Sequence, residues 1–319
     1  MMRRFERIYD VVEPRYRIIG KLAYGQFSTV WFAHDQLLER QVALNILKAD
    51  ASENNQELAT YLRLSALNRN HPGQRHVLEL LDHFKHDGPN GTHLCLVLPV
   101  MISDGKEMTV TGRPRNATYV RMISRQLLLG LNFLHSLNLV HCDLQPANIM
   151  ISLNCDTRGE ILLEPSEFSP VQWLDEDAVD DNAPKYLITT QRRRGQLDGA
   201  EYSELVVKIG DLGGALRAPE LIHGEAWDSG IDIWALGCLI FELATNEPLF
   251  PLGTFGLSRE EIDEEHLHLI SRLLGNDGRL NETFIRHLMD RLPAEFGAAN
   301  VEAFASERRS AARLLDHPF

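Results

Sequence analysis

The chain has 319 residues, and its 32 Lys and Arg against 45 Asp and Glu give a formal net charge of −13. Hydrophobic residues make up 44% of the chain and charged residues 24%, as in ordinary soluble globular proteins. The acidic balance argues against direct nucleic-acid binding, which usually needs a basic face, and is compatible with a basic protein partner.

The first hundred residues predict strands with one helix. Alternating and β-branched residues indicate strands at 16–19, 28–32, 41–47, 77–84 and 94–100. Between the third and fourth of these, residues 54–67 carry Leu58, Tyr61 and Leu62 at helical spacing. We therefore expect a five-stranded sheet accompanied by one helix.

Beyond residue 103 the pattern becomes helical. The strongest helix covers 119–137, with Val120, Ile123, Leu127 and Leu131 on one face. Further helices are predicted at 231–243, 260–274, 281–292 and 311–315.

Residues 152–206 interrupt this helical part. Seven acidic residues fall between Glu164 and Asp181, three prolines lie among or close to them, and Arg192-Arg193-Arg194 follows. Such a composition favours a solvated, mobile insertion over a folded element.

Cysteine content and apolar runs bear on the compartment. The chain has four cysteines, Cys95, Cys142, Cys155 and Cys238. They form no C-x-x-C pair, which argues against a disulfide framework and a structural zinc site. The first residues lack the apolar core of a secretory signal, and the longest apolar run, 231–244, is too short to span a bilayer. We expect an intracellular monomer, in the cytoplasm, the nucleus or both, without a membrane span.

The loop at residues 139–150, Leu-Val-His-Cys-Asp-Leu-Gln-Pro-Ala-Asn-Ile-Met, carries the strongest chemical signal. It follows a long amphipathic helix and precedes a strand-like segment. Asp143 stands five residues before Asn148, which is similar to the protein-kinase catalytic loop H-R-D-x-x-x-x-N. Taken alone, a polar turn between a helix and a strand would also explain it.

Four further motifs occur in the order that this resemblance implies. They are the glycine loop at 23–30, Asp211-Leu212-Gly213 after a strand, Ala218-Pro219-Glu220, and Asp232 within a helix. Five ordered motifs make coincidence negligible, so the expected fold is the α+β, two-lobed protein-kinase fold. The implied boundaries are an extension at 1–15, an N-terminal lobe at 16–101 and a helical lobe at 102–319 that contains the insert.

The resemblance implies roles for the motif residues. Asp143 would accept the proton of the substrate hydroxyl, while Asn148 and Asp211 would hold Mg²⁺. Asp232 would anchor the backbone of the catalytic loop. The other residues with an expected structural role are His141, Glu220 and its partner Arg308.

Within the kinases, the chain resembles the SR-protein kinase (SRPK) family, particularly its divergent fungal-type members. The resemblance rests on Phe-Ser-Thr-Val-Trp at 27–31, D-L-G in place of D-F-G at 211–213, Phe-Glu-Leu-Ala-Thr at 241–245, and the insert. It covers residues 16–319 and implies ATP-dependent phosphorylation of Ser or Thr in basic, Arg/Ser-rich proteins.

The same resemblance outlines a nucleotide site. Leu98 falls at the gatekeeper position, where Pro99 would offer its carbonyl and Met101 its N–H to adenine. Val30, Ala43 and Met150 would enclose the purine, and Ala23 and Gly25 lie in the glycine loop. Each of the three apolar residues is more often a core residue than a cofactor contact.

Several positions depart from the pattern of an active kinase. Asn45 stands where a Lys normally binds the α- and β-phosphates and pairs with a helix Glu, here Glu57. Lys48 is not expected to replace it, because an odd separation along a strand points the two side chains to opposite faces. Gln145 replaces a Lys that neutralises the transferred phosphoryl group, and Ala23 replaces the first loop glycine.

The activation segment is also short, since only residues 212–217 separate Asp211 from Ala218. Cys142 in place of the catalytic-loop Arg leaves no basic pocket for a phosphorylated activation loop. Two hypotheses therefore stand: an SRPK-like kinase impaired at Asn45, Gln145 and the short segment, or a pseudokinase that acts as a scaffold or nucleotide sensor.

Overall fold

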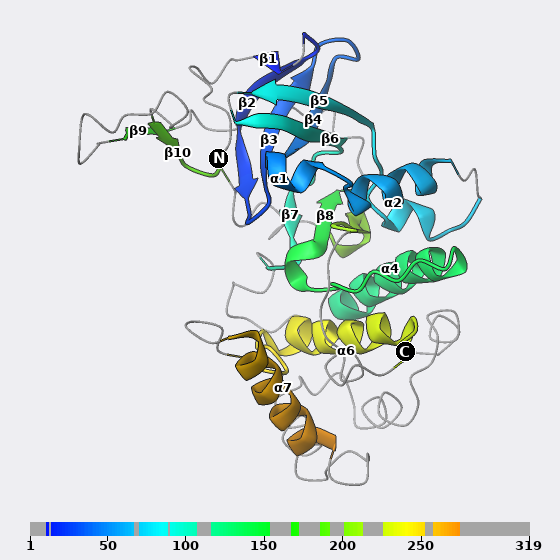
Figure 1. Ribbon diagram of the computed structural model, residues 1–319. Coiled ribbons are helices and arrows are strands. Elements are labelled where there is room, and N and C mark those ends of the chain that lie inside the picture. The colour runs from blue at the N-terminus through cyan, green and yellow to red at the C-terminus, as the bar shows by residue number, and fades with distance from the viewer. Residues whose placement is uncertain are drawn as a thin grey trace. The chain divides into compact units, whose positions relative to one another are not determined.

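The computed structural model comprises two compact units, whose elements are labelled in Figure 1. Unit 1 consists of Met1–Asn68, Leu78–Ile102 and Leu153–Asp198, and unit 2 of Arg69–Val77, Ser103–Ser152 and Gly199–Phe319. The structure describes residues 11–12, 14–66, 70–88, 90–106, 116–153, 167–171, 186–191, 201–212, 226–252 and 258–274. The predicted helices at 281–292 and 311–315, together with Glu220 and Arg308, lie outside these residues.

Unit 1 is built on an antiparallel sheet with strand order β1-β2-β3-β4-β6-β5. The strands are β1 Val11–Val12, β2 Tyr16–Tyr24, β3 Ser28–Asp35, β4 Arg40–Leu47, β5 Asp82–Gly88 and β6 Gly91–Leu98. The five predicted strands are confirmed, and the two-residue β1 is an addition. The fourth begins later than expected, because Val77 belongs to unit 2 and makes a parallel bridge there to Ile209.

One face of this sheet forms the core of unit 1. Buried side chains from alternate positions of β2, β3, β4 and β6 pack together: Tyr16, Ile18, Trp31, Ala33, Val42, Leu44, Ile46, Cys95 and Val97. The predicted helix is present as α2 Gln56–Ser65, preceded by the short α1 Ala49–Ser52. The side chain of Asn55 caps α2 by accepting from the Leu58 N–H at 2.8 Å, which fixes where the helix begins.

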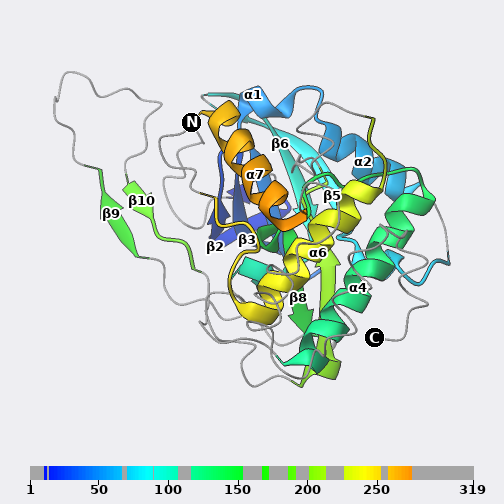
Figure 2. The same ribbon diagram turned by 90° about the horizontal axis from the view of Figure 1, so that it is seen from below.

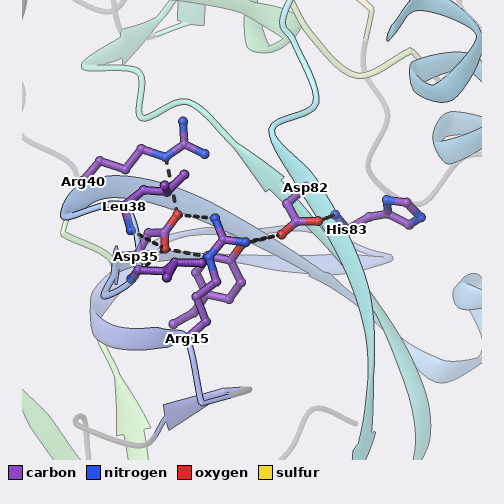
Figure 3. Close-up of polar contacts among 8 residues, drawn as sticks. Arg15, Asp35, Leu38, Arg40, Asp82 and His83 are labelled. Atoms are coloured by element: carbon purple, nitrogen blue, oxygen red, sulfur yellow. Dashed lines mark hydrogen bonds and ion pairs between the residues drawn. The ribbon is translucent and has the colours of Figure 1, made fainter. Parts of the chain in front are cut away.

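An ion-pair network ties the start of β2 to two other strands of the sheet (Figure 3). The Arg15 guanidinium donates to Asp35, at the end of β3, and to Asp82, the first residue of β5. The Tyr16 hydroxyl donates to the same Asp82 oxygen at 2.8 Å. Residue 15, assigned to an N-terminal extension by the sequence, therefore participates in the fold of unit 1.

Two short strands lie within the predicted insert. β9 Phe168–Pro170 pairs antiparallel with β10 Tyr186–Ile188. Ile188 packs against the core of unit 1, and the Gln191 N–H donates to the Lys21 carbonyl of β2 at 2.8 Å. These described parts of the insert are paired strands and a contact with the sheet.

Unit 2 is mainly helical, with α4 Ala117–Ser136, α6 Gly230–Thr245 and α7 Arg259–Leu274. These bounds confirm the predicted helices at 119–137, 231–243 and 260–274, and α4 lies beside α6 in Figures 1 and 2. The predicted apolar face of α4 is buried. A small sheet with order β11-β8-β7 completes the unit, from β7 Ser103–Asp104, β8 Ile149–Leu153 and β11 Leu205–Ile209. Among the described helices, none has the length and apolar character needed to cross a membrane.

Candidate active site

The predicted site residues fall into two groups, one in each unit. Unit 2 holds Asp143, Gln145, Asn148, Met150, Asp211, His141 and Asp232. Unit 1 holds Ala23, Gly25, Val30, Ala43, Asn45, Glu57, Leu98, Pro99 and Met101.

The loop between α4 and β8 carries most of the unit 2 residues. α4 ends at Ser136, and Asn138 then takes a left-handed conformation with φ 54° that turns the chain away from the helix axis. The 3₁₀ helix η2, Pro146–Asn148, closes the loop, and Asn148 N–H donates to the Gln145 carbonyl at 2.9 Å. Met150 follows in β8, where it pairs with Asp104 of β7.

Asp232, near the start of α6, organises the backbone of this loop. Its carboxylate is buried and accepts from the N–H groups of His141 and Cys142, each at 2.9 Å. It also accepts from Nε2 of His135, in the last turn of α4, at 2.7 Å. Three donors therefore converge on one buried carboxylate, which compensates its desolvation and supports the left-handed backbone of Cys142 at φ 66°.

His141 links the loop to the strand that precedes Asp211. Its Nδ1 accepts from the Asp143 N–H at 3.2 Å, so the ring proton must reside on Nε2. Nε2 then donates to the Gly210 carbonyl at 2.8 Å, while the Gly210 N–H donates to the Asn148 carbonyl at 2.9 Å. The neutral imidazole thus fixes the spacing between Asp143 and the end of β11.

Two neutral amides hold the Asp143 carboxylate. Gln145 Nε2 donates to Oδ1 at 3.1 Å and to Oδ2 at 2.9 Å, and Asn148 Nδ2 donates to Oδ2 at 2.9 Å. Burial raises the pKa of Asp143 and the nearby Asp211 raises it further, whereas the hydrogen bonds from Gln145 and Asn148 lower it. The net shift is upward, so this carboxylate binds a proton more strongly than an exposed aspartate does.

The same residues present oxygen atoms suited to a hard divalent cation. Asn148 Nδ2 is directed at both the carbonyl and the carboxylate of Asp143, so Oδ1 must point away from these two acceptors. Asp211 is exposed and has a left-handed backbone with φ 55°. Like-charge repulsion between Asp143 and Asp211 is the condition that a bound cation relieves. The residues present therefore fit Mg²⁺.

This candidate cation site depends on an amide oxygen. Among the described residues, no group of three or more His, Cys, Asp or Glu side chains could hold a metal ion. Asp143 and Asp211 are only two such side chains, and Asn148 is not one of these four residue types. Mg²⁺ is commonly bound by few carboxylates and keeps several water ligands, so the Asn148 amide oxygen can complete such a site.

In unit 1, four of the predicted nucleotide residues share the face of the sheet opposite the core. Val30 of β3 pairs with Asn45 of β4, and Ala43 of β4 pairs with Leu98 of β6. Because side chains alternate along a strand, these four lie on one face. Pro99 and Met101, which follow β6, are half-buried.

The glycine loop joins β2 to β3. Ala23 pairs with Val30 at its base, and the Gly25 N–H donates to the Ser28 carbonyl at 2.9 Å. Tyr24 and Phe27 are 72% and 61% exposed, so the tip of the loop presents two aromatic rings to solvent.

Asn45 has a buried atom without a partner. Its Oδ1 is inaccessible to solvent and accepts no hydrogen bond. Glu57 lies in the first turn of α2 and is half-buried. The sequence argument about Lys48 needs correction, because Lys48 is not part of β4 but the residue that precedes α1.

Sequence reasoning missed two side chains that support this region. His135 lies four residues after Leu131, on the buried face of α4. A polar residue on an otherwise apolar helix face is the feature of the sequence that could have identified it. Gln126 on the same helix was also overlooked, and its contacts with β11 are described below.

Comparison with known proteins identifies relatives over most of the chain. The family model of the protein kinase domain matches residues 16–161. The serine/threonine-protein kinase SRPK of Physarum polycephalum is 32% identical, over 88% of this chain and 70% of its own length. A serine/threonine protein kinase of Aspergillus fumigatus is 30% identical, over 88% and 69%. Protein kinase dsk1 of Schizosaccharomyces pombe is 25% identical, over 82% and 66%.

Proposed function

Because the chain belongs to the SRPK-like serine/threonine protein kinases, we propose that it transfers a phosphoryl group from ATP to Ser or Thr of basic, Arg/Ser-rich proteins. The observation that carries this proposal is the Asp143 carboxylate. Two neutral amides orient it near the oxygen atoms of Asn148 and Asp211 that could bind a cation. Such a carboxylate suits proton acceptance from a hydroxyl beside a bound cation.

The predicted site residues of unit 2 have different roles in the proposed reaction. When bound, Mg²⁺–ATP supplies the phosphoryl group and the positive charge that neutralises it. Asp143 accepts the hydroxyl proton at Oδ1, since Oδ2 already receives two N–H donors. Asn148 Oδ1 and the Asp211 carboxylate would hold the cation, and Asp232 and His141 keep the loop in place.

The proposed basic substrate rests on charge. The chain carries a net charge of −13, and the first turns of α7 expose Glu260, Glu261, Glu264 and Glu265. An acidic surface attracts a basic peptide over several ångströms, more strongly at low ionic strength. An Arg/Ser-rich sequence is the basic substrate class suggested by the SRPK relative.

Asn45 favours a second candidate function, a pseudokinase that binds nucleotide or a partner without efficient transfer. A Lys at this position would bring a positive charge to the phosphates, whereas the Asn45 amide is neutral and its Oδ1 is an unpaired acceptor. The two candidates differ in whether phosphate is transferred at all.

A transfer assay separates them. The full chain is incubated with Mg²⁺–ATP and an Arg/Ser-rich peptide, with an otherwise identical Glu/Ser-rich peptide as the charge control and Asp143→Ala as the blank. We expect incorporation only into the Arg/Ser peptide and only with Asp143 present. Equal incorporation into both peptides would contradict the substrate class, and none above the Asp143→Ala blank would favour the pseudokinase.

A binding measurement tests the cofactors independently of transfer. We expect ATP to raise the melting temperature of the chain in the presence of Mg²⁺ but much less in the presence of EDTA. An Asp211→Ala variant should lose the Mg²⁺-dependent part of the shift. Absence of any shift at millimolar Mg²⁺–ATP would overturn the assignment of nucleotide and metal.

A further inference from the structure

The outer edge of β11, the strand that leads into Asp211, is occupied by side chains. β11 is the terminal strand of its sheet, with β8 on its other side. Gln126 and His76 form hydrogen bonds with the backbone groups of Leu205 and Val207 that face away from β8. Such an edge is otherwise paired by another strand.

Gln126, on α4, supplies the larger part of this pairing. Its Oε1 accepts from the Val207 N–H at 2.9 Å, and its Nε2 donates to the Leu205 carbonyl at 2.9 Å. The second Nε2 hydrogen is directed at the sulfur of Met122, one turn earlier on α4. The side-chain amide therefore pairs with β11 as a strand backbone would, and its donors and acceptor are used.

The remaining outward groups of β11 are met by the segment around η1, Gln74–His76. Arg75 Nε donates to His76 Nε2 at 3.1 Å, so His76 carries its proton on Nδ1 and donates it to the Val207 carbonyl at 2.9 Å. Val77 bridges Ile209 two residues later. Three alternate residues of β11, Leu205, Val207 and Ile209, are thus held by contacts on the side that faces away from β8.

Close packing brings these elements together. A Cβ at Gly130 of α4 would lie 2.8 Å from the His76 carbonyl oxygen and 2.9 Å from Ile209 Cδ1. The absence of a side chain at Gly130 lets α4 approach both η1 and β11. Gln126 lies one turn earlier on the same helix, and this places its amide against the backbone of β11.

On the far side of β11 the strand is connected to the candidate active site. Gly210 donates to the Asn148 carbonyl and accepts from His141 Nε2, and Asp211 follows with a left-handed backbone. A shift of β11 along its axis would carry Asp211 away from Asp143 and Asn148.

We propose that Gln126 is a positioning residue for phosphoryl transfer, which fixes β11 so that Asp211 is presented to the cation shared with Asn148. This inference rests on the proposed function, because it assigns Asp211 to the metal. Gln126 itself touches neither nucleotide nor substrate in this assignment and acts through the backbone of β11.

The test compares Gln126→Met, which keeps the side-chain length but loses both backbone hydrogen bonds, with Arg125→Met as the matched control. Arg125 is exposed on the same helix. Hydrogen exchange of residues 205–212 is measured in the ligand-free protein, and the Mg²⁺ concentration for half-maximal thermal stabilisation is measured at saturating ATP.

For Gln126→Met we expect exchange about fivefold faster at the Val207 and Gly210 amides. The half-maximal Mg²⁺ concentration should rise about tenfold, with the half-maximal ATP concentration unchanged. Arg125→Met should match the wild type in all three. A lower melting temperature with unchanged Mg²⁺ and ATP midpoints would mean that Gln126 only stabilises the fold, and would overturn the inference.

Failure of the proposed function has a different signature. If the wild-type chain shows no Mg²⁺-dependent stabilisation by ATP, the metal assignment fails, and exchange at Gly210 alone decides whether Gln126 fixes β11. Faster exchange confined to Val207 would then refute that role as well. Should Gln126→Met fail to fold, Gln126→Glu keeps an acceptor for the Val207 N–H and should give intermediate values.

Discussion

Arg15 binds the carboxylate of Asp35 through two parallel hydrogen bonds, with Nε and Nη2 each 2.7 Å from a carboxylate oxygen (Figure 3). The side chain of Asp35 is fully buried. The hydrogen bonds from Arg15 hold the pKa of Asp35 down to about 2 against the opposing effect of burial. Arg15 precedes β2, yet it determines the electrostatics at the far end of β3.

The first prediction concerns the pH dependence of this pair. The pKa of Asp35 is lower in the folded chain than in the unfolded chain, so the stabilisation is complete above about pH 4 and is lost as the pH falls towards 2. Arg15→Met should lower the free energy of unfolding by about 2 kcal/mol at pH 7 and by much less at pH 2.5.

Urea unfolding at both pH values measures this difference. Arg17→Met is the control, since Arg17 is exposed on β2 two residues after Arg15, and should have little effect. An equal loss for Arg15→Met at pH 7 and pH 2.5 would show that the interaction with Asp35 is not responsible.

The second prediction concerns Asp232. Asp232→Asn replaces one acceptor oxygen by an NH₂ group, which faces backbone N–H groups or His135 Nε2 whichever way the amide turns. We expect a loss of about 3 kcal/mol in unfolding free energy and a fall of more than about tenfold in any transfer activity.

Asp228→Asn is the matched control for Asp232. Asp228 is exposed and accepts from the Gly230 N–H at 2.7 Å near the start of the same helix. Its substitution should cost less than about 1 kcal/mol. Similar thermal unfolding of the two variants would argue against Asp232 as the anchor of the loop.

The third prediction concerns Gly73, next to η1. A Cβ at this position would overlap the backbone carbonyl of Leu129 on α4, and backbone atoms cannot move aside as a flexible side chain can. Gly73→Ala should therefore destabilise unit 2 by about 3 kcal/mol or more. Gly25→Ala, with no atom within 4 Å of the added Cβ, should change thermal stability little. Comparable melting temperatures for the two would contradict the observed packing of η1 on α4.

The fourth prediction addresses Asn45. Asn45→Lys adds a charge at the position that kinases use for the α- and β-phosphates. We expect the ATP concentration for half-maximal thermal stabilisation to fall about tenfold, and transfer to an Arg/Ser-rich peptide to rise. Asp143→Ala in the Asn45→Lys background is the blank. A variant that binds ATP no better than the wild type would show that Asn45 does not face the phosphates.

The fifth prediction concerns the reactivity of Cys142. Burial, together with the charges of Asp232 and Asp143, raises the pKa of its thiol to about 11. At pH 8 roughly one thiol in a thousand is therefore ionised, and only the thiolate reacts with alkylating agents. Mass spectrometry should show Cys142 alkylated about a hundredfold more slowly in the native chain than in urea. Equal rates would contradict the structure around this residue.

Much of the fold follows from local sequence pattern. The helices α4, α6 and α7 and the strands β2, β3, β4 and β6 show periodicities that report burial directly, so their positions could be predicted. The fourth strand could not be delimited, because the apolar residues before Asp82 suit a strand, but Val77 belongs to unit 2 and pairs there with Ile209. Hydrophobic periodicity identifies an extended segment but does not determine which segment pairs with it.

Residues of the candidate site could be predicted only where they belong to a recognisable sequence motif. Asp143, Asn148 and Asp232 were found through spacing and resemblance, and the structure brings Asp143 and Asn148 into contact. Contacts such as Arg15 with Asp82, or Gln126 with Leu205, join residues separated by 67 and 79 positions. No local pattern encodes these pairs, because the residues meet only after the backbone has folded.

The amide of Asn148 has its nitrogen on the oxygen atoms of Asp143, which leaves its own oxygen for a cation. Under the proposed function, one planar group therefore couples the orientation of the base Asp143 to the binding of the cation. Asn148→Asp would strengthen the attraction for a cation while directing a third negative carboxylate at Asp143, and Asn148→Ala would remove both contacts at once. If this assignment holds, the kinetic effect of a substitution at position 148 cannot be divided between metal binding and proton transfer, and selection on either process constrains the other.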